Sequence, residues 1–235
     1  MKVLIACEES QEVCKAFREA GHEAYSLDIK PCSGGHPEWH IQKAMNPYIR
    51  DGYCSLTTQD GAYVYVNSRW DLIIAHPPCT YLSNVGNRHH SLKSASAEAI
   101  VERTIKRIEA EGFFMMFANA KCKRIAIENP QGVMNSVYRQ PDQTIDPYMF
   151  AESEEDEENY CCKRTCLWLK GLPPLWPEND LSRPDNKKIY GINKNGKTKS
   201  WEETRRKSGE ERRTIRSKTF PGIAKAMAKQ WGALL

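Results

Sequence analysis

The chain opens with a short apolar run, an amphipathic stretch and a second apolar run, and this order predicts a strand, a helix and a strand. We expect the strands over residues 2–7 and 22–27. Between them, apolar positions recur at helical spacing over residues 11–20, a helix that Ser10 would cap and Gly21 would end. Such a strand–helix–strand unit is typical of a nucleotide-binding α/β sheet with parallel strands.

Two further apolar runs each end at a proline turn that presents a reactive side chain. The first, residues 72–75, is followed by His76, two prolines and Cys79. The second, residues 123–127, is followed by Glu128, Asn129 and a proline. Proline cannot extend a central strand, so each turn begins at the carboxyl end of its strand. Because ligands of open α/β sheets bind at that edge, we expect Cys79 and Glu128 to converge on one ligand.

The other patterns complete a single domain. We expect a hairpin over 51–67 with Tyr63 and Tyr65 on one face, a long crossover helix over 94–117 that packs on the sheet, and a strand within 160–169. A last helix spans 223–231. The predicted fold class is α/β, Rossmann-like, with a mostly parallel sheet and helices on both faces.

Composition narrows the setting of this domain. The 235 residues contain no apolar run near the ~20 residues that a membrane span needs, and the first apolar run is too short for a signal peptide. Nine cysteines, an odd number without framework spacing, favour reduced thiols in the cytoplasm. His36, His40 and the cluster Cys161, Cys162 and Cys166 do not form a convincing zinc motif, so we expect no metal.

Charge is unevenly distributed along the chain. The net charge is only +4, yet residues 152–158 form an acidic run and Lys187 to Lys218 are crowded with Lys and Arg. A basic segment beside a balanced domain indicates a polyanion partner, although a solvated surface is an equally good interpretation of charge alone.

The turn after the first strand favours a ligand with an amino-acid end and a ribose. It contains no glycine, which argues against a pyrophosphate on the backbone, and it carries Glu8, which would attract an ammonium group. The following helix offers free N–H groups to a carboxylate, and Asp28 ends the second strand, where such sheets hold ribose hydroxyls. S-adenosylmethionine combines these groups.

A cysteine and a glutamate at neighbouring strand ends suit one reaction in particular. A thiolate adds to carbon 6 of cytosine while an acid protonates or hydrogen-bonds ring nitrogen 3, and carbon 5 then attacks a sulfonium methyl group. Because a free thiol is only a few per cent ionised at neutral pH, nearby cations would have to assist it.

These residues resemble motifs of the DNA (cytosine-5) methyltransferases, and the resemblance is closest to small phage-type members. His76-Pro77-Pro78-Cys79 is similar to their Pro-Cys nucleophile motif, and Glu128-Asn129-Pro130 to their Glu-Asn motif. The resemblance implies that Cys79 is the nucleophile, that Glu128 contacts nitrogen 3, and that Arg164 or Lys163 assists at the base. The cofactor contacts that it implies come from Ala6, Cys7, Glu8, Ser10, Asp28, Ile29, His76, Pro77, Thr219 and Gly222.

The chain departs from that family in three places. A glycine-rich cofactor loop is missing, and the stretch His40-Ile41-Gln42 continues with Lys43-Ala44 where many relatives have Gly-Asp. A short basic insertion, about 178–218, stands in place of a full target-recognition domain, so sequence specificity would be relaxed or come from a partner. Two alternatives stay open: an amino-methyltransferase acting on adenine or cytosine, and a degenerate methyltransferase fold that binds nucleic acid without turnover.

Overall fold

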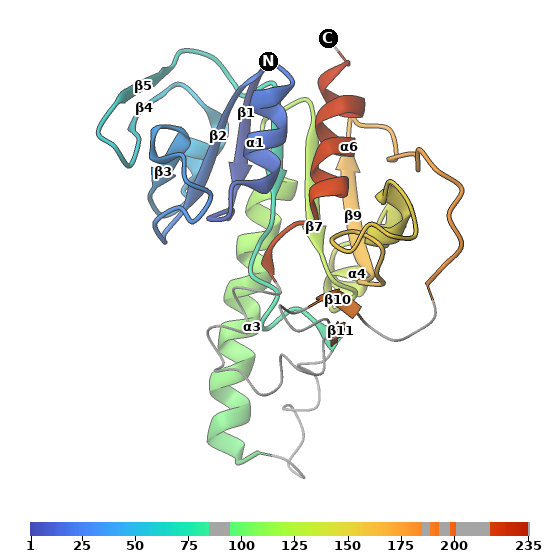
Figure 1. Cartoon of the computed structure of the whole chain (residues 1–235). Coiled ribbons are helices and arrows are strands. Elements are labelled where there is room, and N and C mark those ends of the chain that lie inside the picture. Colours follow the sequence, from blue (N-terminus) through green and yellow to red (C-terminus); the bar gives the residue numbers. More distant parts are fainter. Residues whose placement is uncertain (85–94, 185–188, 193–197, 201–216, 235) are drawn as a thin grey trace.

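The computed structural model describes residues 1–84, 95–184, 189–192, 198–200 and 217–234, and in this part of the chain the central element is a seven-stranded sheet (Figure 1). The strand order is β3-β2-β1-β6-β7-β9-β8. The first five are parallel neighbours, whereas β9 runs antiparallel to both β7 and β8. The strands are β1 (Lys2–Ala6), β2 (Glu23–Asp28), β3 (His40–Gln42), β6 (Leu72–Ala75), β7 (Ile125–Asn129), β8 (Gln143–Ile145) and β9 (Thr165–Lys170).

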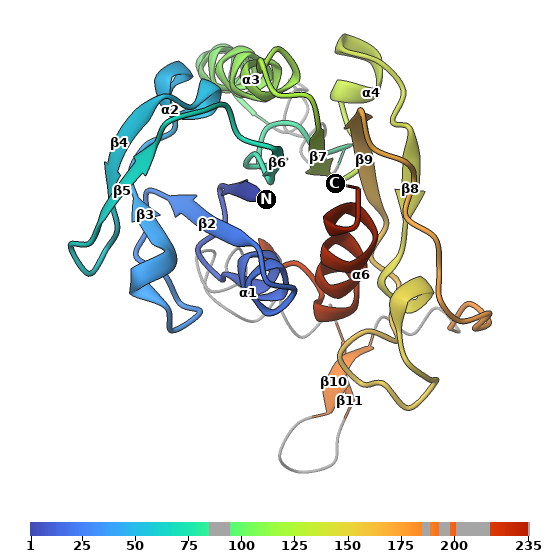
Figure 2. The ribbon, with the colours of Figure 1, turned by 90° about the horizontal axis from the view of Figure 1, so that it is seen from above.

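Helices cover both faces of this sheet, as the sequence predicts (Figure 2). On one face, α1 (Glu12–Glu19) and α6 (Pro221–Gly232) lie against each other and bury Phe17 and Trp231. On the other face, α3 (Ala97–Ala118) packs through Phe114 and Phe117. The fold is therefore α/β with a mixed, mostly parallel sheet, an architecture compatible with a Rossmann-like fold.

Smaller elements complete the described chain. The second face also carries α2 (Pro47–Asp51) and the hairpin of β4 (Cys54–Thr57) and β5 (Tyr63–Val66). Tyr63 and Tyr65 share one face of the hairpin, as predicted; this face is exposed, whereas Val64 and Val66 on the other face are buried. The remaining elements are η1 (Pro37–Trp39), α4 (Met134–Val137), η3 (Pro147–Phe150), β10 (Ile189–Ile192) and β11 (Thr198–Ser200).

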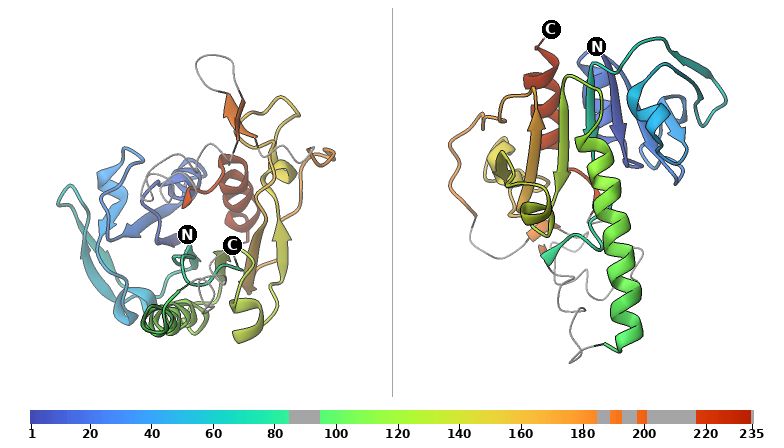
Figure 3. Two further views of the ribbon diagram at one scale, coloured as in Figure 1. Left: turned by 90° about the horizontal axis from the view of Figure 1, so that it is seen from below. Right: turned by 180° about the vertical axis from the view of Figure 1, so that it is seen from behind.

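The predicted crossover helix packs on the sheet, but only through its carboxyl-terminal half. Figures 1 and 3 show the amino-terminal half of α3 extending past the carboxyl ends of the parallel strands. The apolar side chains of Val101, Ile105 and Ile108 in that half are each more than half exposed. Only the last two turns bury large side chains on the sheet, because the sheet ends where the helix continues.

Element boundaries move by one to three residues from the predicted ones. Most consequentially, β7 spans residues 125–129 and not 123–127, because antiparallel pairing with β9 continues to Asn129, with Glu128 opposite Leu167. Glu128 and Asn129 therefore belong to the strand itself. The ordered strand fixes their backbone more firmly than a following turn would.

The predicted basic insertion falls largely outside the described residues. Within Lys187 to Lys218, the described part comprises the backbone of β10 and β11 and residues 217 and 218. Among the helices of the described chain, none has the length and apolar character to cross a membrane.

Candidate functional site

The site lies where the direction of strand succession reverses, between β1 and β6. From β1 the chain passes to β2 on one side, whereas β6 and then β7 lie on the other. Crevices at such points, outside the carboxyl ends of the strands, are the ligand-binding places of open α/β sheets. The turns after β1, β6 and β7 meet there: the His76 N–H donates to the Ala6 carbonyl at 2.9 Å, and Asn129 Nδ2 donates to the Pro77 carbonyl at 2.6 Å.

His76 and Glu128 form the central contact of the site. His76 Nδ1 lies 2.7 Å from Glu128 Oε2, and the two side chains are only 8% and 14% exposed. Burial by itself would raise the pKa of Glu128, but the imidazole and the nearby Lys163 ammonium hold that pKa below its usual range. In the same way, burial opposes the charged imidazole, yet Glu128 and Glu8 raise the pKa of His76. Both shifts favour a charged imidazole beside a charged carboxylate in this buried contact.

Glu8 is a second buried carboxylate beside this pair. It is 4% exposed, and its oxygens accept hydrogen bonds from the backbone N–H groups of Val13 at 2.7 Å and Cys14 at 3.2 Å. Burial raises its pKa to about 7, although His76 and these two N–H groups act in the opposite direction. Glu8 thus takes up N–H groups of α1 that the sequence offered to a ligand carboxylate.

Cys79 lies on an exposed turn whose backbone is ordered. Its carbonyl accepts hydrogen bonds from the N–H groups of Leu82 at 3.1 Å and Ser83 at 3.0 Å, which closes the turn after Pro78. Unlike the buried thiols of Cys14 and Cys166, the Cys79 side chain is exposed. A residue in this position is accessible to a large substrate.

The turn of Cys79 is fastened to the turn that follows Glu128. Ser83 and Gly132 form an antiparallel bridge, and the Val133 N–H donates to the Leu82 carbonyl at 2.8 Å. The approach is so close that a Cβ atom at Gly132 would lie 1.9 Å from the Leu82 oxygen. Glycine is therefore required here, and the two proline turns are held together as one unit.

Lys163 and Arg164, either of which was expected to assist at the base, lie in different parts of the structure. Lys163 Nζ donates to the Lys218 carbonyl at 3.4 Å, lies over the Phe220 ring and acts electrostatically on His76 and Glu128. Arg164 instead lines a separate polar cavity of about 460 Å³. Lys163 is thus the cation associated with the buried pair.

The cavity of Arg164 contains residues that the sequence gave no reason to single out. Asp146 and Arg183 line it, together with Asn135 and Tyr148. Burial raises the pKa of Asp146, against the influence of both arginines, and its Oδ1 is buried without a hydrogen-bond partner in the described chain. Asp146 directly precedes a proline in an ordinary loop pattern, so only the fold reveals its proximity to Arg164.

Asp28 and Ile29, which were expected to contact the nucleoside part of S-adenosylmethionine, lie next to each other at the end of β2. Asp28 is half-buried at the end of β2, where one carboxylate oxygen accepts from the Lys30 N–H at 2.9 Å. The neighbouring Ile29 is 70% exposed, an apolar surface that an adenine ring would cover. Cys7 has a φ of +62°, and the pKa of its half-buried thiol is raised by desolvation and by Asp28. The turn therefore lies beside the expected ribose acid.

The amino-acid side of the cofactor fits less well than predicted. Ser10 does not cap α1; the N-cap is Gln11, which has a φ of +60° and no capping side-chain bond. Ser10 is buried, and a Cβ at Gly34 would approach its carbonyl oxygen to 2.5 Å. Glu8 is buried and accepts hydrogen bonds from two N–H groups of α1, so the structure gives no support to the expected contact from Glu8 to an ammonium group.

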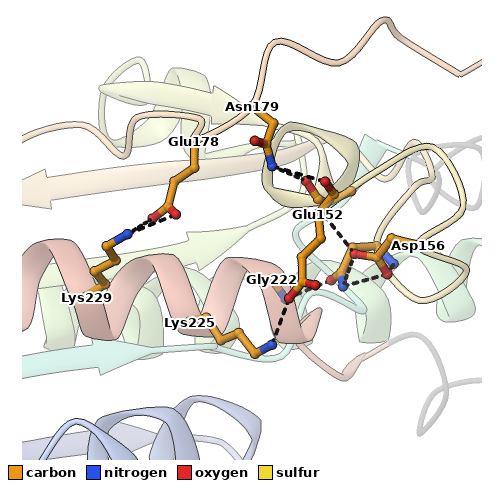
Figure 4. A network of polar contacts seen from close by, with 9 residues as sticks. Glu152, Asp156, Glu178, Asn179, Gly222, Lys225 and Lys229 are labelled. Atoms are coloured by element: carbon orange, nitrogen blue, oxygen red, sulfur yellow. Dashed lines mark hydrogen bonds and ion pairs between the residues drawn. The ribbon is translucent and has the colours of Figure 1, made fainter.

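The segment from Thr219 to Gly222 is held by contacts within the protein. The Gly222 N–H donates to Asn159 Oδ1 at 2.7 Å, and Thr219 is buried. The acidic run contributes to this anchoring: Asp156 accepts hydrogen bonds from Asn159 Nδ2, and Glu152 pairs with Lys225 at 3.3 Å (Figure 4). The acidic run thus serves in part to seat α6, and the Gly222 N–H is already used.

The two predicted loop histidines have structural partners. His40 is fully buried between Ser26 and the Lys30 carbonyl, and His36 stacks on Trp39. Within the described ranges, no three His, Cys, Asp or Glu side chains gather as a metal site, and no disulfide joins the described cysteines.

A scan against models of known protein families and a search of curated proteins both returned no match to this chain. Its function is therefore inferred from the residues of the site and their geometry.

Proposed function

We propose that this protein is an S-adenosylmethionine-dependent methyltransferase that acts on carbon 5 of cytosine in DNA. The observation that carries the proposal is the joining of two proline turns at the switch point of the sheet. One turn presents an exposed thiol, Cys79, and the other follows a buried carboxylate, Glu128. Either residue alone has an ordinary structural explanation, whereas a nucleophile and an acid on two clamped turns suit covalent catalysis.

The chain's own residues would divide the work as follows. The Cys79 sulfur, as a thiolate, forms a bond to carbon 6 of the ring, and Glu128 provides a proton or hydrogen bond to ring nitrogen 3. S-adenosylmethionine would supply the sulfonium methyl group that carbon 5 attacks. Carbon 5 then loses its proton to solvent, and the sulfur–carbon bond breaks to regenerate Cys79. Because ring atoms inside a duplex are out of reach, the cytosine must leave the stack.

The cofactor would lie against Asp28 and Ile29, which leave a carboxylate oxygen and an apolar surface for the ribose and the adenine. Its amino-acid end is not assigned to Glu8, which is buried as the cap of α1. The basic segment from Lys187 to Lys218 would bind DNA phosphates.

The test is covalent trapping. DNA that contains 5-fluorocytosine cannot lose its carbon 5 substituent, so incubation with S-adenosylmethionine should leave a protein–DNA adduct that survives denaturation. We expect Cys79→Ala to abolish the adduct and Cys54→Ala, in the hairpin, to retain it. Methylation of ordinary DNA without trapping would instead identify an amino-methyltransferase, and DNA binding without transfer would identify a binding protein that has lost turnover.

A further inference from the structure

The buried pair poses a chemical problem for the proposed reaction. Glu128 has to provide a proton at ring nitrogen 3, yet the imidazole beside it and Lys163 both favour its anionic form. An anionic carboxylate accepts hydrogen bonds and cannot donate one. A proton for the base must therefore reach Glu128 from a neighbour that stays protonated.

His76 is that neighbour by geometry. The 2.7 Å separation of His76 Nδ1 and Glu128 Oε2 allows a proton to move between them without displacement of either side chain. His76 Nε2 is buried and has no hydrogen-bond partner in the described chain. In the described chain, the imidazole therefore makes one side-chain hydrogen bond, and its partner is Glu128, the proposed acid.

The charges around the imidazole favour its protonated form. Glu128 approaches from β7 and Glu8 from the turn after β1, and both carboxylates stabilise a positive imidazole. Lys163, which precedes β9, acts against it, and burial does so as well. Glu8 is kept in place by two backbone N–H groups of α1, so its position relative to the pair is fixed.

Resting on the proposed function, we propose that His76 is a positioning residue that stores the proton which Glu128 delivers to the cytosine ring. When Cys79 bonds to carbon 6, nitrogen 3 takes a proton from Glu128, and the Nδ1 proton of His76 passes to Glu128. When the sulfur–carbon bond breaks, the proton returns from nitrogen 3 to Glu128 and from Glu128 to His76. The relay begins and ends in the same protonation state, so it consumes no external acid.

This role replaces the cofactor contact that the resemblance implied for His76. His76 Nδ1 is engaged with Glu128, so the proton relay uses the nitrogen that would otherwise be available to a cofactor on that side of the ring. Glu8 binds the helix N–H groups, and it stabilises the protonated imidazole once it is itself ionised, at a pH above about 7.

The first test measures the imidazole directly and requires no turnover. In protein labelled with ¹⁵N at histidine, the His76 signals are assigned by their loss in His76→Gln. We expect both ring nitrogens to remain protonated above the ordinary histidine pKa of ~6.5, and Glu128→Gln to bring titration to lower pH. The His36→Gln variant, which changes a partly exposed histidine paired with Glu38, should leave the His76 signals unchanged. A His76 that is neutral throughout pH 6–8 would overturn the relay.

The second test separates the relay from a merely structural role. Glutamine at position 76 can still donate a hydrogen bond to Glu128 but cannot release a proton. We expect His76→Gln to fold normally and to bind DNA as well as the original protein, while kcat falls about 100-fold or more. In the unaltered protein, kcat should decrease at alkaline pH as His76 loses its proton. This decrease should be absent in His76→Gln. If His76→Gln still forms the Cys79 adduct and keeps the kcat and pH profile of the unaltered protein, the relay is refuted. If the unaltered protein does not form the adduct, the proposed function itself is refuted.

Discussion

Glu8 shows at the level of a single residue how a carboxylate can change roles between sequence and structure. In the sequence it is an acid in an open turn, but in the fold it is buried and binds the amino terminus of α1. Its two hydrogen bonds and the helix dipole stabilise the anion, yet burial outweighs them and the pKa rises to about 7. The folded protein thus holds a proton at Glu8 that the unfolded chain would release.

This shift predicts a particular dependence of stability on pH. Between pH ~4.5, the ordinary value for glutamate, and pH ~7, the folded state binds more protons than the unfolded state, so the contribution of Glu8 to the free energy of unfolding falls as pH rises. Replacement by Gln removes this contribution. We expect urea denaturation of Glu8→Gln to lose less stability between pH 5 and pH 8 than the unaltered protein, by a few kcal/mol.

Glu19→Gln is the matched control, because Glu19 is exposed at the end of the same helix. Its stability should follow the pH dependence of the unaltered protein. If Glu8→Gln follows that dependence as well, Glu8 has an ordinary pKa in the folded protein.

At the level of elements, the two proline turns are joined by a clamp, the contact of Gly132 and Val133 with Leu82 and Ser83. The backbones approach so closely in this clamp that it has no room for a side chain at Gly132. Gly132→Ala would place a Cβ atom 1.9 Å from the Leu82 carbonyl oxygen, so the backbone of one turn has to move. We expect the sheet to stay folded, because Gly132 lies outside its strands, while formation of the Cys79 adduct falls at least 10-fold. Adduct yield and thermal denaturation measure the two effects separately.

Gly112→Ala provides the contrast within α3. A Cβ atom there meets no other atom within 4 Å, and alanine is a better helix former than glycine. This variant should be as active as the unaltered protein and more stable by about 0.5–1 kcal/mol. Equal activity losses in both glycine variants would show that the clamp is not specific to the site.

The two halves of α3 should respond differently to substitution. Val101 and Ile105 are exposed, so replacing either with Gln should change the free energy of unfolding by no more than about 0.5 kcal/mol. Phe117 is fully buried on the sheet, and Phe117→Ala should cost about 3–5 kcal/mol. Chemical denaturation of the three variants checks this. A large cost at Val101 or Ile105 would mean that this apolar stripe is covered.

How much of the fold the sequence predicts depends on the element. Buried strands such as residues 72–75 are recognisable because every position is apolar, and the alternation of residues 63–66 predicts which face of the hairpin is exposed. The end of β7 is less predictable, because it is set by pairing with β9, about forty residues later in the sequence. Helical spacing locates α3, but it does not indicate where the sheet beneath the helix ends.

The candidate site divides in the same way. Sequence pattern is sufficient to select Cys79, Glu128 and Asp28, because each follows or ends a predicted strand. It could not predict that His76 would bind Glu128 or that Glu8 would turn inward to α1, since both depend on side-chain directions at meeting turns. The separation of Arg164 from Lys163 likewise requires three-dimensional structure.

For the whole molecule, the proposed binding of DNA by the basic segment predicts how the association constant should respond to salt. The slope of log K against log salt concentration is negative, and each lost phosphate contact makes it shallower by about 0.9. Replacing Arg205, Arg206 and Lys207 with Gln should therefore reduce the slope by up to about 3 and weaken binding across sequences. Fluorescence anisotropy at several salt concentrations measures the slope.

The same three substitutions at exposed lysines outside the basic segment, Lys30, Lys121 and Lys123, serve as the charge-matched control. Their slope should match that of the unaltered protein. Equal slopes for both triple variants would argue against phosphate binding by the basic segment.

The divergence of Lys163 and Arg164 has a consequence for any attempt to compare chains of this kind by composition. Exchanging these two adjacent letters would yield a protein of identical mass and net charge, but the guanidinium would now be directed to the imidazole and the ammonium to the cavity of Asp146. Two isomeric chains would thus agree in mass and net charge and still place different cations at the buried pair and at the cavity of Asp146.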